Sequence, residues 1–239
     1  MYAIILLNLL KNINLFKVKS CLYLRIPKTA STSFMHKIRR VRNSSGASLS
    51  NLIYTNLYDK IYKDGLDWSN NQFLEFKDKL SSEVFDNLYK FTFVRNPFTR
   101  AVSSYAYLQR RRFIPLMKKY NLFRLDFKNF WKVVYEREIN IICPDQWDDL
   151  SWHLSPMYIH LQNENKEIKI DFIGKLETIK SDFNKICNKL GANEVSSFPT
   201  LRKTSHKSPF DYYDNVTTEL ILRIYEKDFV EFQYESIFK

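Results

Sequence analysis

Three segments of the chain repeat one pattern, in which a short apolar stretch is followed by a sharp polar turn and then by a helical stretch. Short apolar strands that alternate with helices indicate a mainly parallel sheet covered by helices on both faces. We therefore expect an α/β fold. The three expected strand and helix pairs are residues 21–26 with 31–42, residues 90–94 with a helix that begins at Pro97, and residues 168–173 with 177–190.

Particular residues set the boundaries of these elements. Asn96 can cap the second helix with its side chain, and Pro97 suits the first helical position, which needs no N–H partner. Gly191 can adopt the left-handed conformation that ends the third helix. Apolar residues at helical spacing predict two further core-facing helices, within residues 126–136 and 217–232.

The composition predicts one globular domain with a basic surface. The 239 residues are 45% apolar, which suits a single domain over residues 1–239 with an ample core. The net charge of +11 favours an anionic partner such as a nucleotide, an acidic glycan, nucleic acid or an anionic membrane surface. A merely soluble basic surface fits the same charge equally well.

The N-terminal stretch and the cysteines bear on location. The apolar run in MYAIILLNLLKN is much shorter than the roughly 20 residues that span a bilayer. Without features of a signal peptide, it favours a cytoplasmic protein with at most peripheral membrane contact. Cys21, Cys143 and Cys187 match no metal-ligand spacing. Three reduced thiols or one Cys143–Cys187 disulfide both fit, and the reduced state is the one we favour.

The turn after the first strand, residues 27–33 (PKTASTS), is the first place to expect a ligand, because ligands of open α/β sheets bind at the carboxyl ends of the strands. The helix that follows exposes unpaired N–H groups, which suit an anion. Lys28 adds a mobile cation, and the hydroxyl groups of the loop add donors. The GxxxxGK[ST] pattern of ATP and GTP hydrolases is absent. A capped helix start that binds no ligand is the alternative.

The loop and three later segments together resemble one enzyme family. RIPKTASTSF (residues 25–34) is similar to the 5′-phosphosulfate loop of the carbohydrate sulfotransferases, most of all in the heparan and dermatan sulfate 2-O-sulfotransferase branch. FTFVRNPFTRAVSSYAYL (residues 91–108) resembles that family's 3′-phosphate motif, and DFIGKLETIKSDF (residues 171–183) resembles its IGxLE segment. The stretch from Ile224 to Tyr234 resembles its C-terminal helix, so the resemblance covers nearly the whole chain.

The resemblance implies a three-layer, P-loop-like sulfotransferase fold and 3′-phosphoadenosine 5′-phosphosulfate as co-substrate. The implied reaction moves a sulfuryl group to a hydroxyl of a glycan or glycolipid. By the family's pattern, Lys28 stabilises the leaving phosphate, while Arg95 and Ser103 bind the 3′-phosphate. The other implied donor-binding residues are Thr29, Ala30, Ser31, Thr32, Ser33 and, in a late loop, Arg202, Lys203 and Thr204. A solvated basic turn is the alternative for that late loop. No metal is expected, because the donor has no β,γ-phosphate pair to bridge.

The residue that accepts the proton of the acceptor hydroxyl is the point at which the chain departs from this family. The 2-O-sulfotransferase branch carries a catalytic histidine before the 3′-phosphate motif, but residues 37–95 here contain no histidine. Glu75 is our choice among the acidic residues of that stretch. His153, in WHLSPMYI, resembles the family's segment near the acceptor cleft and is the other candidate, with a structural role as its alternative. We expect residues 110–160 to shape the acceptor cleft.

Two other functions fit parts of the sequence. A catalytically inactive relative that binds a nucleotide or a glycan would explain the missing histidine. A nucleic-acid binder would explain the charge and the basic run at residues 110–112, but no nucleic-acid motif accompanies that run, so this function is disfavoured. A solvated helix end is the simplest interpretation of the same three arginines.

Overall fold

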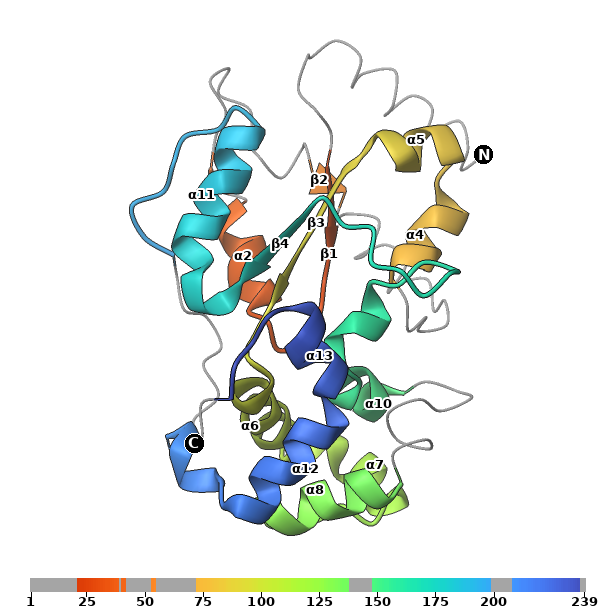
Figure 1. Cartoon of the computed structure of the whole chain (residues 1–239), viewed down its shortest axis with the longest axis vertical. Helices are drawn as coiled ribbons and strands as arrows, with labels where there is room; N and C mark the ends of the chain where they lie inside the picture. The colour runs from red at the N-terminus through yellow and green to blue at the C-terminus, as the bar shows by residue number, and fades with distance from the viewer. Residues whose placement is uncertain are drawn as a thin grey trace.

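The computed structural model describes residues 21–38, 40–41, 53–54, 72–137, 148–198 and 208–236. Within them, four parallel strands form one sheet in the order β2-β1-β3-β4 (Figure 1). The strands are β1 (Cys21–Leu24), β2 (Ile53–Tyr54), β3 (Tyr89–Val94) and β4 (Phe172–Lys175). The parallel α/β sheet expected from the sequence is confirmed, and β2 is a strand that the sequence pattern did not reveal.

Helices cover both faces of the sheet, because the side chains of a strand alternate between its faces. Cys21 and Tyr23 of β1 pack into a cluster with helices α2 (Ser31–Ile38) and α11 (Ile179–Lys189). Leu22 and Leu24 pack on the other face, in a cluster with α4 (Gln72–Lys79) and α5 (Ser82–Asn87). The two pairs of helices flank the sheet in Figure 1. This is the three-layer arrangement that the sulfotransferase resemblance implies.

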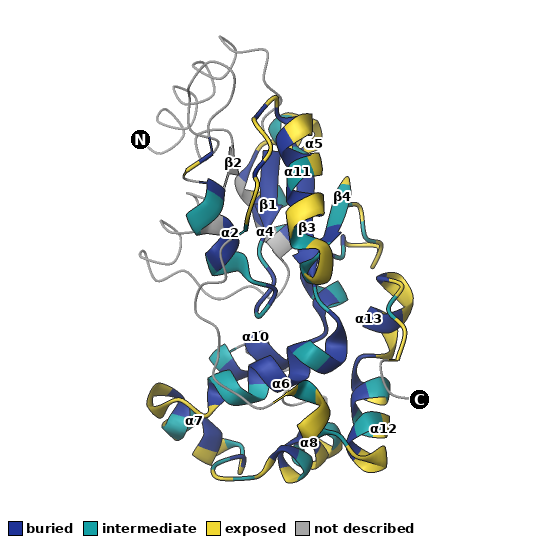
Figure 2. Cartoon of the chain, turned by 90° about the vertical axis from the view of Figure 1, so that its left-hand side faces the viewer, coloured by how far each residue is buried: buried dark blue, intermediate teal, exposed yellow. Residues whose placement is uncertain are grey.

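A helical half continues from the carboxyl end of β3 and lies below the sheet in Figure 1. Its own hydrophobic cluster is built on Phe98, Phe130, Trp131 and Ile221. Figure 2 shows α6 and α10 largely buried in the middle of this half, with exposed residues on its outer helices. Its elements are α6 (Pro97–Leu108), η2 (Arg111–Phe113), α7 (Ile114–Lys119), α8 (Phe127–Glu136), α10 (Asp149–Leu154), η3 (Met157–His160), η5 (Pro209–Tyr212), α12 (Asn215–Ile224) and α13 (Glu226–Glu231).

The helix boundaries predicted from capping residues are confirmed. The side chain of Asn96 accepts a hydrogen bond from the N–H of Phe98 at 3.0 Å, and Pro97 is the first residue of α6. Gly191 has a φ of 65° directly after α11, the conformation that only glycine adopts without strain. Helix α8 buries four residues of the predicted apolar stripe, Phe127, Phe130, Trp131 and Val134.

Two predicted elements have different boundaries. The strand expected at 168–173 is displaced to Phe172–Lys175, because Asp171 anchors the approach to β3. The N–H of Asp171 donates to the carbonyl of Lys90 at 2.9 Å, and its carboxylate accepts the N–H of Lys90 at 2.7 Å. The helix expected at 217–232 is broken at Tyr225 into α12 and α13, where the Tyr225 hydroxyl donates to the carbonyl of Leu154 at 2.7 Å.

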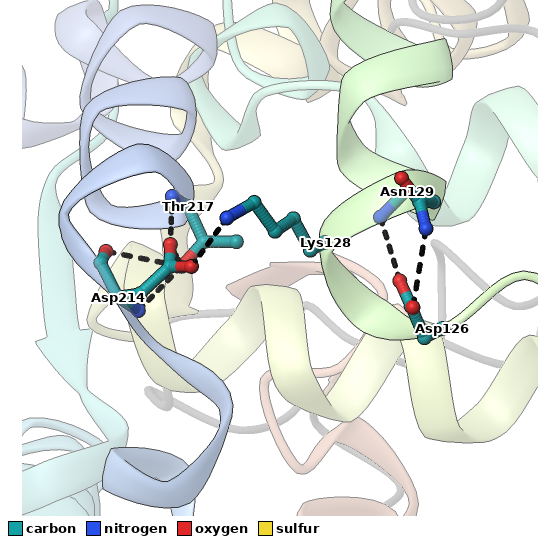
Figure 3. A network of polar contacts seen from close by, with 5 residues as sticks. All are labelled: Asp126, Lys128, Asn129, Asp214 and Thr217. Carbon is teal, nitrogen blue, oxygen red and sulfur yellow. Dashed lines mark hydrogen bonds and ion pairs between the residues drawn. The ribbon is translucent and has the colours of Figure 1, made fainter.

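The N-termini of α8 and α12 are joined by a polar network, which Figure 3 shows. Asp126 caps α8 by accepting the N–H of Asn129 at 2.8 Å, and Asp214 caps α12 by accepting the N–H of Thr217 at 2.8 Å. Lys128 of α8 reaches across and donates to the Asp214 carboxylate at 2.7 Å. Charged caps of this kind satisfy N–H groups that have no partner within the helix.

The structure covers only part of what was predicted for the N-terminal apolar stretch and for a Cys143–Cys187 disulfide. Residues 1–20 and Cys143 lie outside the described residues. Cys21 and Cys187 are buried free thiols. Within the described ranges, none of the helices has the length and apolar character required to cross a membrane.

Candidate active site

The loop between β1 and α2 has a strained backbone. Lys28 and Ala30 both have left-handed φ values, 67° and 61°, which cost a residue with a side chain roughly 1–2 kcal/mol each. The carbonyl of Ala30 accepts the N–H of Phe34 at 3.0 Å and so opens the helix. A backbone that alternates in this way turns successive N–H groups toward one side and creates a concavity suited to an anion. The strain therefore supports the prediction of an anion-binding loop.

The hydroxyl groups predicted to bind the donor lie in two different settings. Thr29 is fully buried, and its hydroxyl donates to the carbonyl of Ile26 at 2.9 Å. The hydroxyl proton is therefore used in a hydrogen bond within the loop. Ser31, Thr32 and Ser33 form the first turn of α2, where unpaired N–H groups collect. Ser31 and Thr32 are partly exposed, whereas Ser33 is buried.

Arg95 connects this loop to the turn after β3. Its Nε donates to the hydroxyl of Thr99 at 2.9 Å, and its Nη1 donates to the carbonyl of Lys28 at 3.3 Å. Glu177 fixes the same turn by accepting the N–H of Asn96 at 2.8 Å. Burial lowers the pKa of Arg95 to about 10, opposed by the charge of Glu177, so Arg95 stays a cation at neutral pH.

Ser103 lies on α6, about two turns after Arg95. It is 6% exposed, and its hydroxyl forms no hydrogen bond to any residue that the structure describes. Arg95 and Ser103 do not contact each other through a hydrogen bond.

Arg100 is a buried cation directly below the loop. It is 1% exposed, and its Nε donates to the carbonyl of Pro27 at 3.2 Å. The fully buried carboxylate of Asp228 interacts with it electrostatically. Asp228 also accepts the N–H groups of Met157 and Tyr158 at 2.8 and 2.9 Å. Burial raises the pKa of Asp228 to about 6, against the charge of Arg100 and these two hydrogen bonds.

The ammonium group of Lys28 lies over an aromatic ring. Its Nζ is 3.9 Å from the centroid of the Tyr107 ring, a distance typical of a cation–π contact. Arg110 and Arg112 approach the same ring, with guanidinium carbons 4.6 and 5.1 Å from its centroid. Burial lowers the pKa of Lys28 to about 7, and the charges of Arg95, Arg110, Arg100 and Arg112 lower it further in the same direction.

His153 lies beside this group of cations. Its ring stacks on Tyr107 with the centroids 4.8 Å apart, and its Nδ1 is 2.6 Å from the carbonyl oxygen of Asp149. Because a carbonyl oxygen only accepts, Nδ1 carries the proton of the neutral ring and Nε2 is its basic nitrogen. Burial lowers the pKa of His153 to about 3, and the charges of Lys28, Arg100 and Arg112 act in the same direction, so the ring is neutral at physiological pH.

Other predicted site residues lie wholly or partly outside the described structure. Glu75 lies on α4, against the sheet face opposite α2, and its side chain lies outside the described part of the structure. Arg202, Lys203 and Thr204 also lie outside it. Among the described residues, no group of three or more potential ligands is arranged to hold a metal ion.

The sequence interpretation missed Tyr107. For the basic run that contains Arg110 and Arg112 it favours a solvated helix end, with an acidic-acceptor surface as the alternative. The signal for Tyr107 was present, because Arg100, Ser103 and Tyr107 follow helical spacing and lie on one face of α6. The arginines, interpreted as a solvated helix end, are exposed but cluster around the Tyr107 ring. Arg112 also donates a hydrogen bond to the Tyr107 hydroxyl.

The sequence as a whole matches a family model described as "Sulfotransferase family", over residues 11–235. The chain belongs to the sulfotransferase family. This match confirms the family resemblance noted from the sequence, and Lys28 and Arg95 lie in two of the motifs that carry that resemblance.

Named relatives agree with this assignment. Over 172 residues, the sulfotransferase is 26% identical to carbohydrate sulfotransferase 11 of Rattus norvegicus and of Mus musculus. Each alignment covers 61% of this chain and 46% of the relative, so the chain spans about half the length of the curated relatives it matches. It is also 29% identical over 119 residues to an uncharacterized protein of Archaeoglobus fulgidus, which covers 49% of this chain and 80% of that protein.

Proposed function

We propose that this sulfotransferase takes its sulfuryl group from 3′-phosphoadenosine 5′-phosphosulfate and transfers it to a hydroxyl of a glycan or glycolipid. The observation that carries the proposal is a cluster of cations around a strained loop. Lys28, Arg95, Arg100, Arg110 and Arg112 converge there, and none is ion-paired with a carboxylate in the described part of the chain. Like charges held together disfavour one another unless an anion binds between them.

Each end of the proposed donor has its own group of residues. The N–H groups of the loop and of the first turn of α2 would hold the 5′-phosphosulfate. Arg95 and the unengaged hydroxyl of Ser103 would hold the 3′-phosphate, for which a planar guanidinium is well suited. Lys28 would neutralise the charge that develops on the leaving phosphate, since a loose transfer is stabilised mainly by positioning and charge. The proximity of Arg95 to the Lys28 carbonyl supports this division.

His153 is the proposed proton acceptor for the acceptor hydroxyl. Its Nε2 is basic in the neutral ring, and the ring lies against the same tyrosine as Lys28. An anionic donor would offset the surrounding cations that lower the pKa of His153, so the ring becomes a better base in the complex. Arg110, Arg112 and His153 all come from residues 110–160, which supports an acceptor role for that segment. The relatives named carbohydrate sulfotransferase support a glycan acceptor.

Nucleotide binding and sulfate transfer can be measured separately. We expect 3′-phosphoadenosine 5′-phosphate to raise the melting temperature of the wild-type protein, and Lys28→Ala and Arg95→Ala to weaken this effect. Lys180→Ala, which removes an exposed lysine from α11, is the matched control and should bind like the wild type. His153→Gln should bind the nucleotide normally but lower the transfer of labelled sulfate about 10²-fold or more, as for the loss of a general base.

The outcomes distinguish the proposed enzyme from its alternatives. No thermal shift at millimolar nucleotide would contradict the proposed donor. Nucleotide binding without transfer to any acceptor in a screen of glycans and cell extracts would favour an inactive relative. Full transfer activity in His153→Gln would remove His153 from the mechanism and leave Glu75 as the candidate.

A further inference from the structure

Tyr107 occupies a central place for which the proposed reaction gives no role. It lies near the end of α6, and its partly exposed ring is surrounded by Lys28, Arg110, Arg112 and His153. The Lys28 ammonium is the nearest of the three cations to the ring centroid. An aromatic ring attracts cations through its negative face, and the attraction reaches about 2 kcal/mol when the pair is shielded from water.

The remaining surroundings of Lys28 repel its charge. Its Nζ forms no hydrogen bond or ion pair with a described residue. Arg95 lies in the turn before α6 and Arg100 in its first turn, while Arg110 and Arg112 lie in the segment that follows α6, and the charges of all four lower the pKa of Lys28. The other charged groups around this cluster include His153 and three carboxylates. Glu177 acts on Arg95, Asp149 on Arg112 and Asp228 on Arg100.

We propose that Tyr107 is a positioning residue that holds the charged Lys28 side chain beside the donor loop until the donor binds. The inference rests on the proposed function, because the donor is the anion to which Lys28 then moves. Charge-assisted hydrogen bonds to a phosphate are stronger than a cation–π contact, so the transfer from ring to donor is favourable only when the donor is present.

The position of Lys28 on the ring couples donor binding to the uptake of a proton by Nζ. With a pKa of about 7, part of the Lys28 population is neutral at neutral pH in the free protein. The negative charge of the nucleotide favours the ammonium form, so binding draws a proton from solvent onto Nζ. The ring also favours the ammonium form. Loss of the ring therefore lowers the pKa of Lys28 further. The affinity for the nucleotide should then begin to fall at a lower pH.

Calorimetric titration with 3′-phosphoadenosine 5′-phosphate between pH 6 and 9, in two buffers of different ionisation enthalpy, tests this role. The wild type should take up protons, with affinity that falls as the pH rises. In Tyr107→Leu the midpoint of this fall should move to lower pH by roughly half a unit or more, while Tyr107→Phe, which keeps the ring, should retain the wild-type midpoint. Lys28→Arg should take up clearly fewer protons than the wild type, because arginine stays charged.

The results separate the inference from the proposed function. If the wild type binds no nucleotide, the proposed function fails. If it binds and Tyr107→Leu keeps the wild-type midpoint, or if Lys28→Arg takes up as many protons as the wild type, the positioning role is overturned and the proposed function stands. Should Tyr107→Leu be unfolded by circular dichroism, Tyr107→Gln repeats the test with a polar side chain that suits the partly exposed position.

Discussion

Lys28 combines a left-handed backbone with a partly buried charge, and neither feature favours folding. Its pKa is about 7, below the ordinary value of 10.5. Between these two pH values the unfolded chain binds more protons than the folded protein, so the free energy of unfolding rises with pH across this range. Below pH 7 the full cost of the buried charge is present.

Lys28→Met should therefore stabilise the protein in a pH-dependent way. We expect the gain in the free energy of unfolding to be largest at pH 6 and to shrink toward pH 10, because the wild-type lysine is then neutral as well. Urea unfolding at several pH values measures this gain. Lys180→Met should show no such dependence, and an equal gain for Lys28→Met at pH 6 and pH 10 would contradict the charge argument.

Elements whose boundaries depend on local chemistry were predictable from the sequence. Asn96 and Pro97 begin α6, and Gly191 follows α11, because capping requires only neighbouring residues. The boundaries that depend on distant partners were not. Asp171 displaces β4 through its bonds to Lys90, and the contact of Tyr225 with Leu154 accompanies the break between α12 and α13. These partners are far apart in the chain and carry no local signal.

The charged cap of α12 is an element whose contribution can be measured. Asp214→Ala removes the cap and the ion pair with Lys128, and should lower the free energy of unfolding by about 1–2 kcal/mol. Asp214→Asn keeps a capping oxygen and should lower the free energy of unfolding by only a few tenths of a kcal/mol, since exposed ion pairs contribute little. Chemical denaturation compares the two variants. Equal losses would show that the ion pair, and not the cap, stabilises α12.

In the molecule as a whole, two buried charges lie where the sheet and the helical half meet: Arg100 and Asp228, which interact electrostatically without a direct salt bridge. Arg100 donates a hydrogen bond to the carbonyl of Pro27. Asp228 accepts hydrogen bonds from the N–H groups of Met157 and Tyr158, which follow α10. The loop between β1 and α2 and the segment after α10 are therefore each held by one of two buried charges that act on each other. The sequence placed Arg100 and Asp228 in two separate motifs of the resemblance but gave no indication that the two charges act on each other, because only the folded chain brings α13 near Arg100.

Asp228→Ala should be strongly destabilising. Removal of the carboxylate leaves the buried N–H groups of Met157 and Tyr158 without their acceptor and takes away the charge that acts on Arg100. We expect a loss of about 3 kcal/mol or more in the free energy of unfolding. The double variant Arg100→Met/Asp228→Ala should recover part of this loss, which a double-mutant cycle quantifies. Strict additivity of the two single changes would contradict a coupling between them.

The link from Pro27 through Arg100 to Asp228 also has a consequence during protein synthesis. During translation, β1 and the loop that follows it leave the ribosome early. Helix α13 comes after every other element of the described fold. A nascent chain that has not yet released α13 carries Arg100 without its counter-charge. We therefore expect the loop between β1 and α2 to reach its folded form only after α13 has docked.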